Sequence, residues 1–256
     1  MAATTNAAAK AFKALHKPGQ PLVLTNVYDI LSARAVASLP AAKALATASW
    51  AVAKANGLED DGLDMETNLG TVRGIAAVAR ESNKPLTVDF QDGYGDQLEA
   101  GIARLIALGV SGINLEDADK ETSQLFAPAE AASRVKRALA AAAQAGVPDF
   151  VVNARCDVLG RGAGSLEDTI QRGKLYLDAG ATTVFVWGGS RGVSRDEVET
   201  LTRAFDGRLN VTLKLAPDGL TVKQLGEIGV ARISLGPSLM LRAMAAFKAE
   251  AEKILS

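Results

Sequence analysis

Short apolar runs of strand length alternate along the chain with longer segments in which apolar residues recur at helical spacing. The runs with strand character cover residues 21–29, 44–49, 86–91, 112–117, 149–157, 182–188, 209–214 and 231–236. Helical spacing predicts helices over residues 6–16, 31–39, 68–82, 97–108, 129–145, 166–179, 195–204 and 238–253. Residues 49–67 follow neither period, and we expect an irregular connection there.

Alternation of strands with helices is typical of parallel βαβ units. The rhythm continues through the chain without a linker, which favours one domain, residues 1–256, folded as a closed (β/α)8 barrel. A doubly wound open sheet is the alternative. The last helix, residues 238–253, has apolar positions that suit packing on a partner subunit as well as on its own barrel. These positions are Leu239, Met240, Leu241, Met244 and Phe247.

Composition and charge narrow the class of protein. Apolar residues make up 48% of the chain and charged residues 22%, as in a globular protein with a large core. The net charge of −1 offers no basic surface for nucleic acid or membranes, and no apolar run reaches the roughly 18 residues of a membrane span. The first residues lack the pattern of a secretory signal, so we expect a cytoplasmic protein. The single cysteine, Cys156, and the single histidine, His16, exclude internal disulfides and multi-histidine or cysteine-based metal sites.

Charged and amide side chains occupy the carboxyl ends of several predicted strands, where barrel enzymes place their chemistry. Alternation directs them into the barrel, and burying ionised groups is costly unless they are paired or bind a metal. The cluster therefore indicates a functional site. A structural ion-pair network between Arg155 and Asp157 or Glu116 is the alternative interpretation. The inward-facing residues are Asp89, Gln91, Asn114, Glu116, Asn153, Arg155, Asp157, Asn210, Thr212 and Lys214.

The segment LTVDFQDGYGD, residues 86–96, begins as an alternating strand and breaks into a glycine-flanked turn. Asp89, Asp92 and Asp96 lie at or just after the break. Mg²⁺ is typically held by one or two carboxylates and retains several waters, so the stretch predicts a magnesium site centred on Asp89. A solvated loop with N-cap acids is the alternative, and we expect that role for Asp96.

Five motifs resemble the isocitrate lyase/phosphoenolpyruvate mutase superfamily over nearly the whole chain. They are residues 57–60 (GLED), Asp89 with residues 93–95 (GYG), residues 115–117 (LED), 153–157 (NARCD) and 232–237 (RISLGP). The resemblance implies a (β/α)8 barrel whose last helix is often swapped between the subunits of a dimer or tetramer. It also implies Mg²⁺ (or Mn²⁺) held directly by Asp89 and through waters by Asp60 and Glu116, with Asp92 as a further candidate ligand.

The same resemblance implies a small carboxylic acid as substrate. Its 2-oxo acid end would chelate the metal, with the carboxylate on backbone N–H groups near Ser49 and Trp50. Arg155 would bind the developing oxyanion or a second acidic group, and Glu116 and Lys120 complete the candidate catalytic set. The remaining candidate substrate-binding residues are Tyr28, Trp187 and Asn210, and Tyr28 is also an alternative to Lys120 as a base.

Departures from the family pattern bear on the reaction. Many members carry aspartate where this chain has Gln91. The loop after strand 112–117 lacks the cysteine of isocitrate and methylisocitrate lyases, so those two activities are not expected. Lys120 and Ser123 match the phosphonomutase branch in part, but Trp187 stands where that branch has a histidine.

Three functions are consistent with these residues. We favour a Mg²⁺-dependent lyase that cleaves a C–C bond of a small 2-oxo or 2-hydroxy di- or tricarboxylic acid through an enolpyruvate-like enolate. A P–C bond mutase or hydrolase of the phosphonopyruvate type is the first alternative. A non-catalytic metabolite-binding barrel, motivated by Gln91, is the second. The sequence leaves open the substrate, the choice between dimer and tetramer, and whether the Lys120 loop closes over the substrate.

Overall fold

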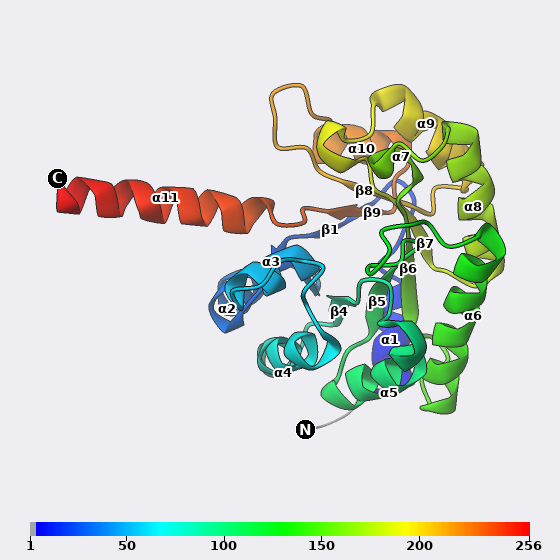
Figure 1. Ribbon diagram of the computed structural model, residues 1–256, viewed down its shortest axis with the longest axis horizontal. Coiled ribbons are helices and arrows are strands. Elements are labelled where there is room, and N and C mark those ends of the chain that lie inside the picture. Colours follow the sequence, from blue (N-terminus) through cyan, green and yellow to red (C-terminus); the bar gives the residue numbers. More distant parts are fainter. Residues whose placement is uncertain (1–3) are drawn as a thin grey trace.

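Nine short strands form the wall of a nearly closed barrel in the computed structural model, which describes residues 4–256 (Figure 1). The strands are β1 Leu22–Leu24, β2 Asn26–Val27, β3 Leu45–Thr47, β4 Leu86–Asp89, β5 Gly112–Glu116, β6 Val151–Cys156, β7 Thr183–Val186, β8 Leu209–Thr212 and β9 Arg232–Ser234. Their order is β1-β9-β8-β7-β6-β5-β4-β3-β2, and all these pairings are parallel.

The barrel is completed by residues 22–27, which pair with both edges of the sheet. β1 pairs with β9 and β2 pairs with β3, so the predicted first strand is divided at Thr25, where the chain passes from one partner to the other. The predicted barrel is therefore confirmed, and the open sheet is excluded. This arrangement brings the carboxyl ends of all the strands to one end of the barrel.

The helices mostly follow a strand and cover the outside of the barrel, whereas the first helix precedes the first strand and the last helix extends away (Figure 1). They are α1 Asn6–Lys13, α2 Ile30–Ala37, α3 Ser49–Ala55, α4 Met65–Glu81, α5 Leu98–Leu108, α6 Pro128–Gln144, α7 Val158–Arg161, α8 Leu166–Asp178, α9 Arg195–Ala204, α10 Val222–Ile228 and α11 Ser238–Leu255, with 3-10 turns at Gly95–Gln97 and Gly189–Arg191. Among the helices of residues 4–256, none combines the length and the apolar character that crossing a lipid bilayer requires.

Three of these helices, α3, α7 and α10, are absent from the predicted set. The expectation of an irregular connection over residues 49–67 was wrong, because α3 fills the first part of that segment and its Val52 and Ala53 pack on Leu63. Each of the three helices has seven residues or fewer. An amphipathic period cannot be recognised over so short a stretch, so the sequence pattern contained no usable signal.

Apolar side chains fill the layer between strands and helices, whereas part of the barrel interior is polar. Asn153 Nδ2 donates to Asn114 Oδ1 at 2.7 Å, and Thr183 Oγ1 donates to Asn153 Oδ1 at 2.5 Å. The fully buried Arg232, at the amino end of β9, donates from Nη2 to the same Asn114 oxygen at 3.0 Å. These contacts fix Asn114 from below, while the buried Nε of Arg232 has no partner among the described residues.

α11 projects away from the barrel (Figure 1). None of its residues, 238–255, is buried, and the side chains of Leu241, Met244 and Phe247 are 53%, 48% and 72% exposed. An isolated helix with such an apolar surface gains little from its own chain, because helical stability in proteins comes mostly from packing. Contact with a second subunit remains a prediction for this helix.

His16 lies just beyond α1, at the amino end of the barrel. Its Nδ1 is 3.1 Å from the Phe12 carbonyl oxygen, and its Nε2 is 3.5 Å from Arg232 Nη1. This pattern fits a neutral ring that donates from Nδ1 and accepts from the guanidinium at Nε2. Burial, together with the charge of Arg232, lowers the pKa of His16 to about 3. The residue therefore has a structural role, outside the cavity at the strand ends.

The neutral state of His16 predicts a pH dependence of stability. Because its pKa is lower in the folded chain than in the unfolded one, its stabilising contribution is present above pH 6.5 and is lost as the pH falls. We expect about 1.4 kcal/mol of unfolding free energy to be lost per pH unit below 6.5. Urea unfolding of wild type and His16→Asn, at about pH 7.5 and about pH 5.5, measures the difference. Equal losses in both proteins would assign the effect to other groups.

Candidate active site

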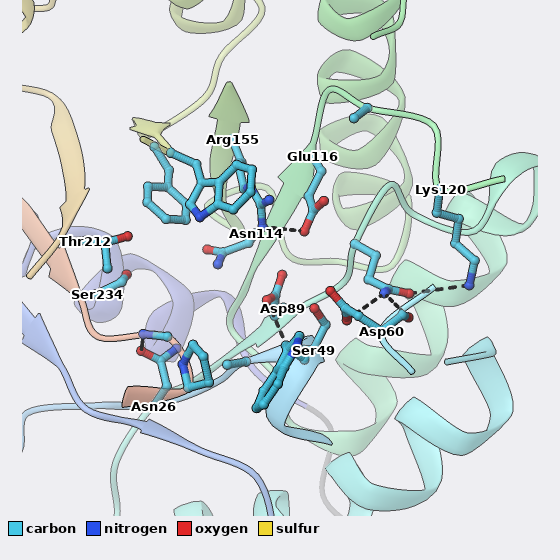
Figure 2. Close-up of a pocket in the computed structure, with 18 of the residues that line it drawn as sticks. Asn26, Ser49, Asp60, Asp89, Asn114, Glu116, Lys120, Arg155, Thr212 and Ser234 are labelled. Atoms are coloured by element: carbon cyan, nitrogen blue, oxygen red, sulfur yellow. Dashed lines mark hydrogen bonds and ion pairs between the residues drawn. The ribbon is translucent and has the colours of Figure 1, made fainter. Parts of the chain in front are cut away.

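A cavity of about 410 Å³ lies at the carboxyl ends of the strands (Figure 2). Asp89, Glu116 and Arg155 enter it from the neighbouring strands β4, β5 and β6, and Lys120 enters from the loop after β5. Asp89, Glu116 and Arg155 therefore point into the barrel, as the alternation of side chains along their strands predicts. Other residues that line the cavity are Asn26, Ser49, Trp50, Asp60, Asp61, Gln91, Asn114, Ser123, Arg161, Phe185, Trp187, Thr212 and Ser234.

Asp89 is the last residue of β4 and is 8% exposed. Its Oδ2 accepts the backbone N–H of Ser49 at 2.9 Å, and its own backbone N–H donates to Thr47 Oγ1 at 2.9 Å. Its Oδ1 is buried and has no hydrogen-bond partner among the described residues. A buried carboxylate oxygen without a partner is costly, so Asp89 Oδ1 is suited to a ligand that the protein itself does not provide.

Asp60 is held beside Asp89 by Gln91, the residue that departs from the family pattern. Gln91 Nε2 donates to the backbone oxygen of Asp60 at 2.8 Å and to its Oδ1 at 3.1 Å. Burial, and next the charge of Asp89, raise the pKa of Asp60 above its ordinary value. An amide at position 91 can clamp Asp60 because it donates hydrogen bonds, whereas a carboxylate there would add a third negative charge.

The donor set fits a hard divalent cation bound by few protein ligands. Within residues 4–256 there is no group of three or more histidine, cysteine or acidic side chains close enough to hold a metal together. Mg²⁺ does not require such a group, because it commonly takes one or two carboxylates and keeps waters. Asp89 Oδ1 is buried and free of other partners among the described residues, and Asp60 and Glu116 lie around the same cavity. Asp92 does not line the cavity, and its Oδ1 accepts the backbone N–H of Tyr94 at 2.9 Å.

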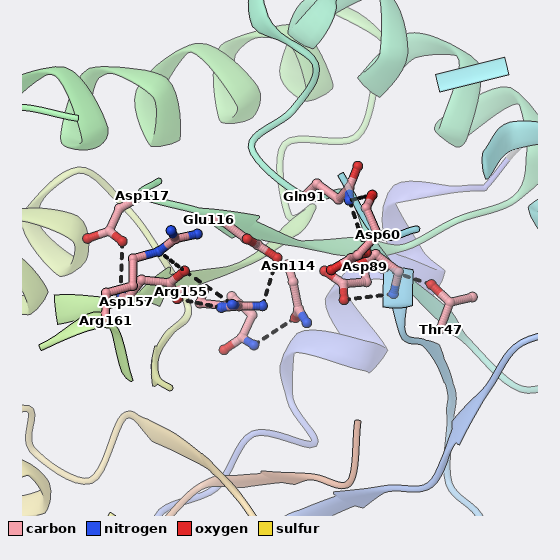
Figure 3. Close-up of polar contacts among 12 residues, drawn as sticks. Thr47, Asp60, Asp89, Gln91, Asn114, Glu116, Asp117, Arg155, Asp157 and Arg161 are labelled. Carbon is pink, nitrogen blue, oxygen red and sulfur yellow. Dashed lines mark hydrogen bonds and ion pairs between the residues drawn. The ribbon is translucent and has the colours of Figure 1, made fainter. Parts of the chain in front are cut away.

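Arg155 is held on two sides by carboxylates (Figure 3). Its Nη1 donates to Glu116 Oε1 at 2.7 Å, while Nε and Nη2 donate to the two oxygens of Asp157 at 2.6 and 3.1 Å. Its guanidinium carbon lies 4.4 Å from the centre of the Trp187 ring. The ion-pair network that the sequence offered as an alternative is thus present, and the same guanidinium also lines the cavity.

The charges of this network shift each other's protonation. Asp157 and Glu116 raise the pKa of Arg155 against the opposing effect of burial, which keeps the guanidinium charged. Burial raises the pKa of Glu116 well above its usual range, and Asp157, Asp89 and Asp60 add to the shift while Arg155 opposes it. Among the residues that line the cavity, the acids Asp60, Asp61, Asp89 and Glu116 outnumber the bases Lys120, Arg155 and Arg161, and an excess of negative charge favours binding of a cation.

Lys120 is oriented by the loop between β5 and α6. Its Nζ donates to the Leu63 carbonyl oxygen at 2.7 Å and lies 3.4 Å from Gln91 Oε1. The ammonium also stands 4.8 Å from the centre of the Tyr94 ring. The side chain lines the cavity, and its ammonium is held there by a backbone carbonyl and the Gln91 amide oxygen.

Two candidate substrate-binding residues lie outside the cavity lining. Tyr28 packs beside Val52, Ala53 and Leu63, and Asn210 is buried in the barrel with its Nδ2 donating to Ser234 Oγ at 3.1 Å. Ser49 and Trp50 do line the cavity, but the Ser49 N–H expected to bind substrate already donates to Asp89. Trp187 forms a wall of the cavity.

Several lining residues escaped the sequence reasoning. Asn26 Oδ1 accepts the backbone N–H groups of Leu235 and Gly236 at 3.0 and 2.9 Å, so it ties the first strand segment to the end of β9. That role depends on closure of the barrel and leaves no signal in local sequence. Arg161 lies in a glycine-rich stretch that alternation cannot orient. Ser234 was noticed only as part of the closing motif.

A parallel α/β barrel with a carboxylate-lined cavity at its strand ends belongs to the architecture of barrel enzymes. The family model for phosphoenolpyruvate phosphomutase matches residues 12–255, and the chain belongs to the phosphoenolpyruvate mutase/isocitrate lyase superfamily. An uncharacterized protein of Mycobacterium tuberculosis is 35% identical over 226 residues, which are 88% of this chain and 81% of that protein.

Solved structures with a similar fold cover nearly the whole chain. A Burkholderia cenocepacia J2315 protein, provisionally assigned as a phosphonomutase, has 37% identity and a TM-score of 0.86, with 97% of this chain and 98% of that chain covered. Oxaloacetate acetylhydrolase in complex with the product oxalate has 23% identity and a TM-score of 0.87, over 99% of this chain and 88% of that chain. Phosphonopyruvate hydrolase in complex with oxalate and Mg²⁺ has 24% identity and a TM-score of 0.81, over 98% and 87%. The last two share the fold.

Asn114 in the cavity floor is predicted to be important for stability. Asn114→Leu would leave the buried Arg232 guanidinium and the Asn153 amide without their shared acceptor. We expect a loss of about 1–3 kcal/mol of unfolding free energy for each donor left unsatisfied, measured by urea titration. The double variant Asn114→Leu/Arg232→Met should be less destabilised than Asn114→Leu alone, because the buried guanidinium that lost its acceptor is gone. Destabilisation below about 1 kcal/mol in the single variant would contradict this account.

Proposed function

We propose that the protein is a lyase, dependent on Mg²⁺ (or Mn²⁺), that cleaves a C–C bond of a small 2-oxo or 2-hydroxy di- or tricarboxylic acid through an enolpyruvate-like enolate. The observation that carries the proposal is the unpaired, buried Oδ1 of Asp89 in a cavity shared with Asp60, Glu116 and Arg155. Two enzymes with this fold bind oxalate, a planar chelating acid that resembles enolpyruvate, and one of them binds it with Mg²⁺.

Three acidic residues of the cavity would hold the cation. Asp89 would hold the cation directly, and Asp60 and Glu116 would hold it through waters. When bound, Mg²⁺ supplies a Lewis acid that stabilises negative charge on a neighbouring oxygen. The clamp from Gln91 keeps Asp60 in position for this role.

Arg155 retains hydrogen-bonding capacity for a substrate. A guanidinium has five N–H bonds, and Glu116 and Asp157 engage three of them. The two that remain, one on each terminal nitrogen, can donate to the developing oxyanion or to a second carboxylate. Because the two acids and Trp187 fix the guanidinium plane, little reorganisation is needed when charge develops.

Lys120 is the candidate for proton transfer. When the C–C bond beside the carbonyl breaks, its electron pair moves onto the carbonyl oxygen as an enolate, and the enolate carbon then takes up a proton. Lys120 lines the cavity and can donate this proton, or accept the hydroxyl proton in a retro-aldol cleavage. Tyr28, the alternative base, does not line the cavity, which favours Lys120.

A thermal-shift titration with oxalate, with and without Mg²⁺, tests the proposal. A ligand that binds only the folded chain stabilises it, by about 2.7 kcal/mol at a hundred times its dissociation constant. We expect a rise in melting temperature only when both are present, and loss of that rise in Asp89→Asn. Asp218→Asn, which changes an exposed acid paired with Lys214, is the matched control. Absence of any shift in wild type would favour a non-catalytic barrel.

Turnover distinguishes the two bond types. Lys120, Ser123 and the Burkholderia relative favour the P–C alternative, whereas Trp187 occupies the place where the resemblance implies histidine. Incubation with phosphonopyruvate followed by ³¹P NMR should show no product, while a panel of 2-oxo and 2-hydroxy acids with Mg²⁺ should yield one that is cleaved. A new phosphorus resonance would replace the C–C lyase with a mutase or hydrolase.

We further propose that the protein is a homo-oligomer, a dimer or tetramer, in which α11 contacts a second subunit. The exposed Leu241, Met244 and Phe247 support this proposal, because apolar surface of this kind is commonly buried in interfaces. Phe247→Asp should shift the mass measured by light scattering toward the monomer. Lys248→Ser, on the same helix, should leave the mass unchanged. A monomeric wild type would contradict the proposal.

A further inference from the structure

A second polar cluster lies behind Arg155, between the sheet and α8. It is built on Asp117 and Asp157, which directly follow β5 and β6 and are 2% and 0% exposed. Asp117 Oδ1 accepts the backbone N–H of Asp157 at 2.8 Å (Figure 3). Asp157 in turn receives Arg155, so the orientation of the guanidinium depends on how this carboxylate pair is held.

Helix α8 holds Asp117 from the side away from the cavity. Tyr176 Oη donates to Asp117 Oδ2 at 2.6 Å, and Arg172 Nη1 lies 3.4 Å from the same oxygen. Tyr176 is 1% exposed. Each oxygen of the Asp117 carboxylate therefore has a fixed partner, one in the strand segment and one in the helix.

Two arginines connect this carboxylate pair to the loop that carries Lys120. Arg172 Nη2 donates to the Phe126 carbonyl oxygen at 2.9 Å. Arg161 donates from Nε to Asp157 Oδ2 at 3.2 Å and from Nη1 to the Ser123 carbonyl oxygen at 3.1 Å. Residues 118–126 are thus tied at two points to the carboxylates that orient Arg155.

We propose that Arg161 and Arg172 are positioning residues that couple the conformation of loop 118–126 to the orientation of Arg155. If the loop moves away, Arg161 and Arg172 each lose a backbone carbonyl acceptor. The two arginines are then less well fixed, and so are their contacts with Asp157 and Asp117. The placement of Lys120 and the placement of Arg155 are then linked rather than independent. The importance of the link for catalysis rests on the proposed function, whereas the link itself does not.

The coupling can be tested without metal or substrate. Hydrogen–deuterium exchange of the whole protein measures how often the backbone of residues 118–126 opens. Fluorescence of Trp187 reports on the position of Arg155, because the guanidinium stacks on the Trp187 ring. Trp50→Phe leaves Trp187 as the single tryptophan of the chain. In that background, Arg161→Gln and Arg172→Gln should each raise exchange in residues 118–126 about fivefold and acrylamide quenching of Trp187 about twofold.

Arg172→Gln is the decisive variant, because it changes a residue with no direct contact to Asp157 in the described hydrogen bonds. The matched control is Arg195→Gln, which removes an arginine from an exposed pair with Glu199 and should change neither signal. A faster loop with unaltered Trp187 quenching would overturn the coupling. Unaltered exchange in both variants would also overturn it, since neither arginine would then hold the loop.

A replacement variant and a ligand titration complete the experiment. If Arg172→Gln does not fold, Arg172→Lys, which retains one charge but loses the two-pronged geometry, replaces it. An oxalate titration of the wild-type protein with Mg²⁺, in which Trp50 and both arginines are intact, reports on the proposed function separately. Coupling without any oxalate response of the wild type would refute the lyase proposal alone, and an oxalate response without coupling would refute only this inference.

Discussion

A charged guanidinium buried at the strand ends of a barrel must be compensated, and Arg155 receives that compensation from Glu116 on one side and Asp157 on the other. Asp157 is oriented to accept the hydrogen bonds of Arg155 because Asp117 accepts the backbone N–H of Asp157. Asp117 is itself held by the hydroxyl of Tyr176 on α8. The geometry of the cavity therefore depends on a chain of ion pairs and hydrogen bonds that crosses the sheet. Removing one member would leave charge uncompensated in the others.

The acidic side chains that line the cavity, by contrast, lie close to one another. Burial raises the pKa of Asp60 and Glu116, and the neighbouring carboxylates, Asp89 among them, add to the shift. Asp89 Oδ1 has no partner within residues 4–256. Such an arrangement is unfavourable without a cation and becomes favourable with one. Gln91 fits this picture, since its amide supports Asp60 without adding charge.

Residues at the centre of the cavity could be predicted from the sequence because strand alternation is a local property. Asp89, Glu116 and Arg155 follow from the period of two and from the rule that barrels place chemistry at the carboxyl ends of strands. Asn26 and Arg161 could not be found in this way. Asn26 reaches the end of β9 only because the barrel closes, and Arg161 lies on a four-residue helix in a glycine-rich stretch.

By itself the sequence determined the alternation of strands and helices, the barrel, and the acidic and basic residues at the strand ends, because these depend on periodicity and on order along the chain. Only the tertiary structure decided the partners of each charge. It placed Ser49 N–H on Asp89 and left Asp89 Oδ1 unpaired, and it connected Arg161 to Ser123 across the site. Such contacts join residues far apart in sequence, so distance and direction in space decide them, and no local pattern encodes either.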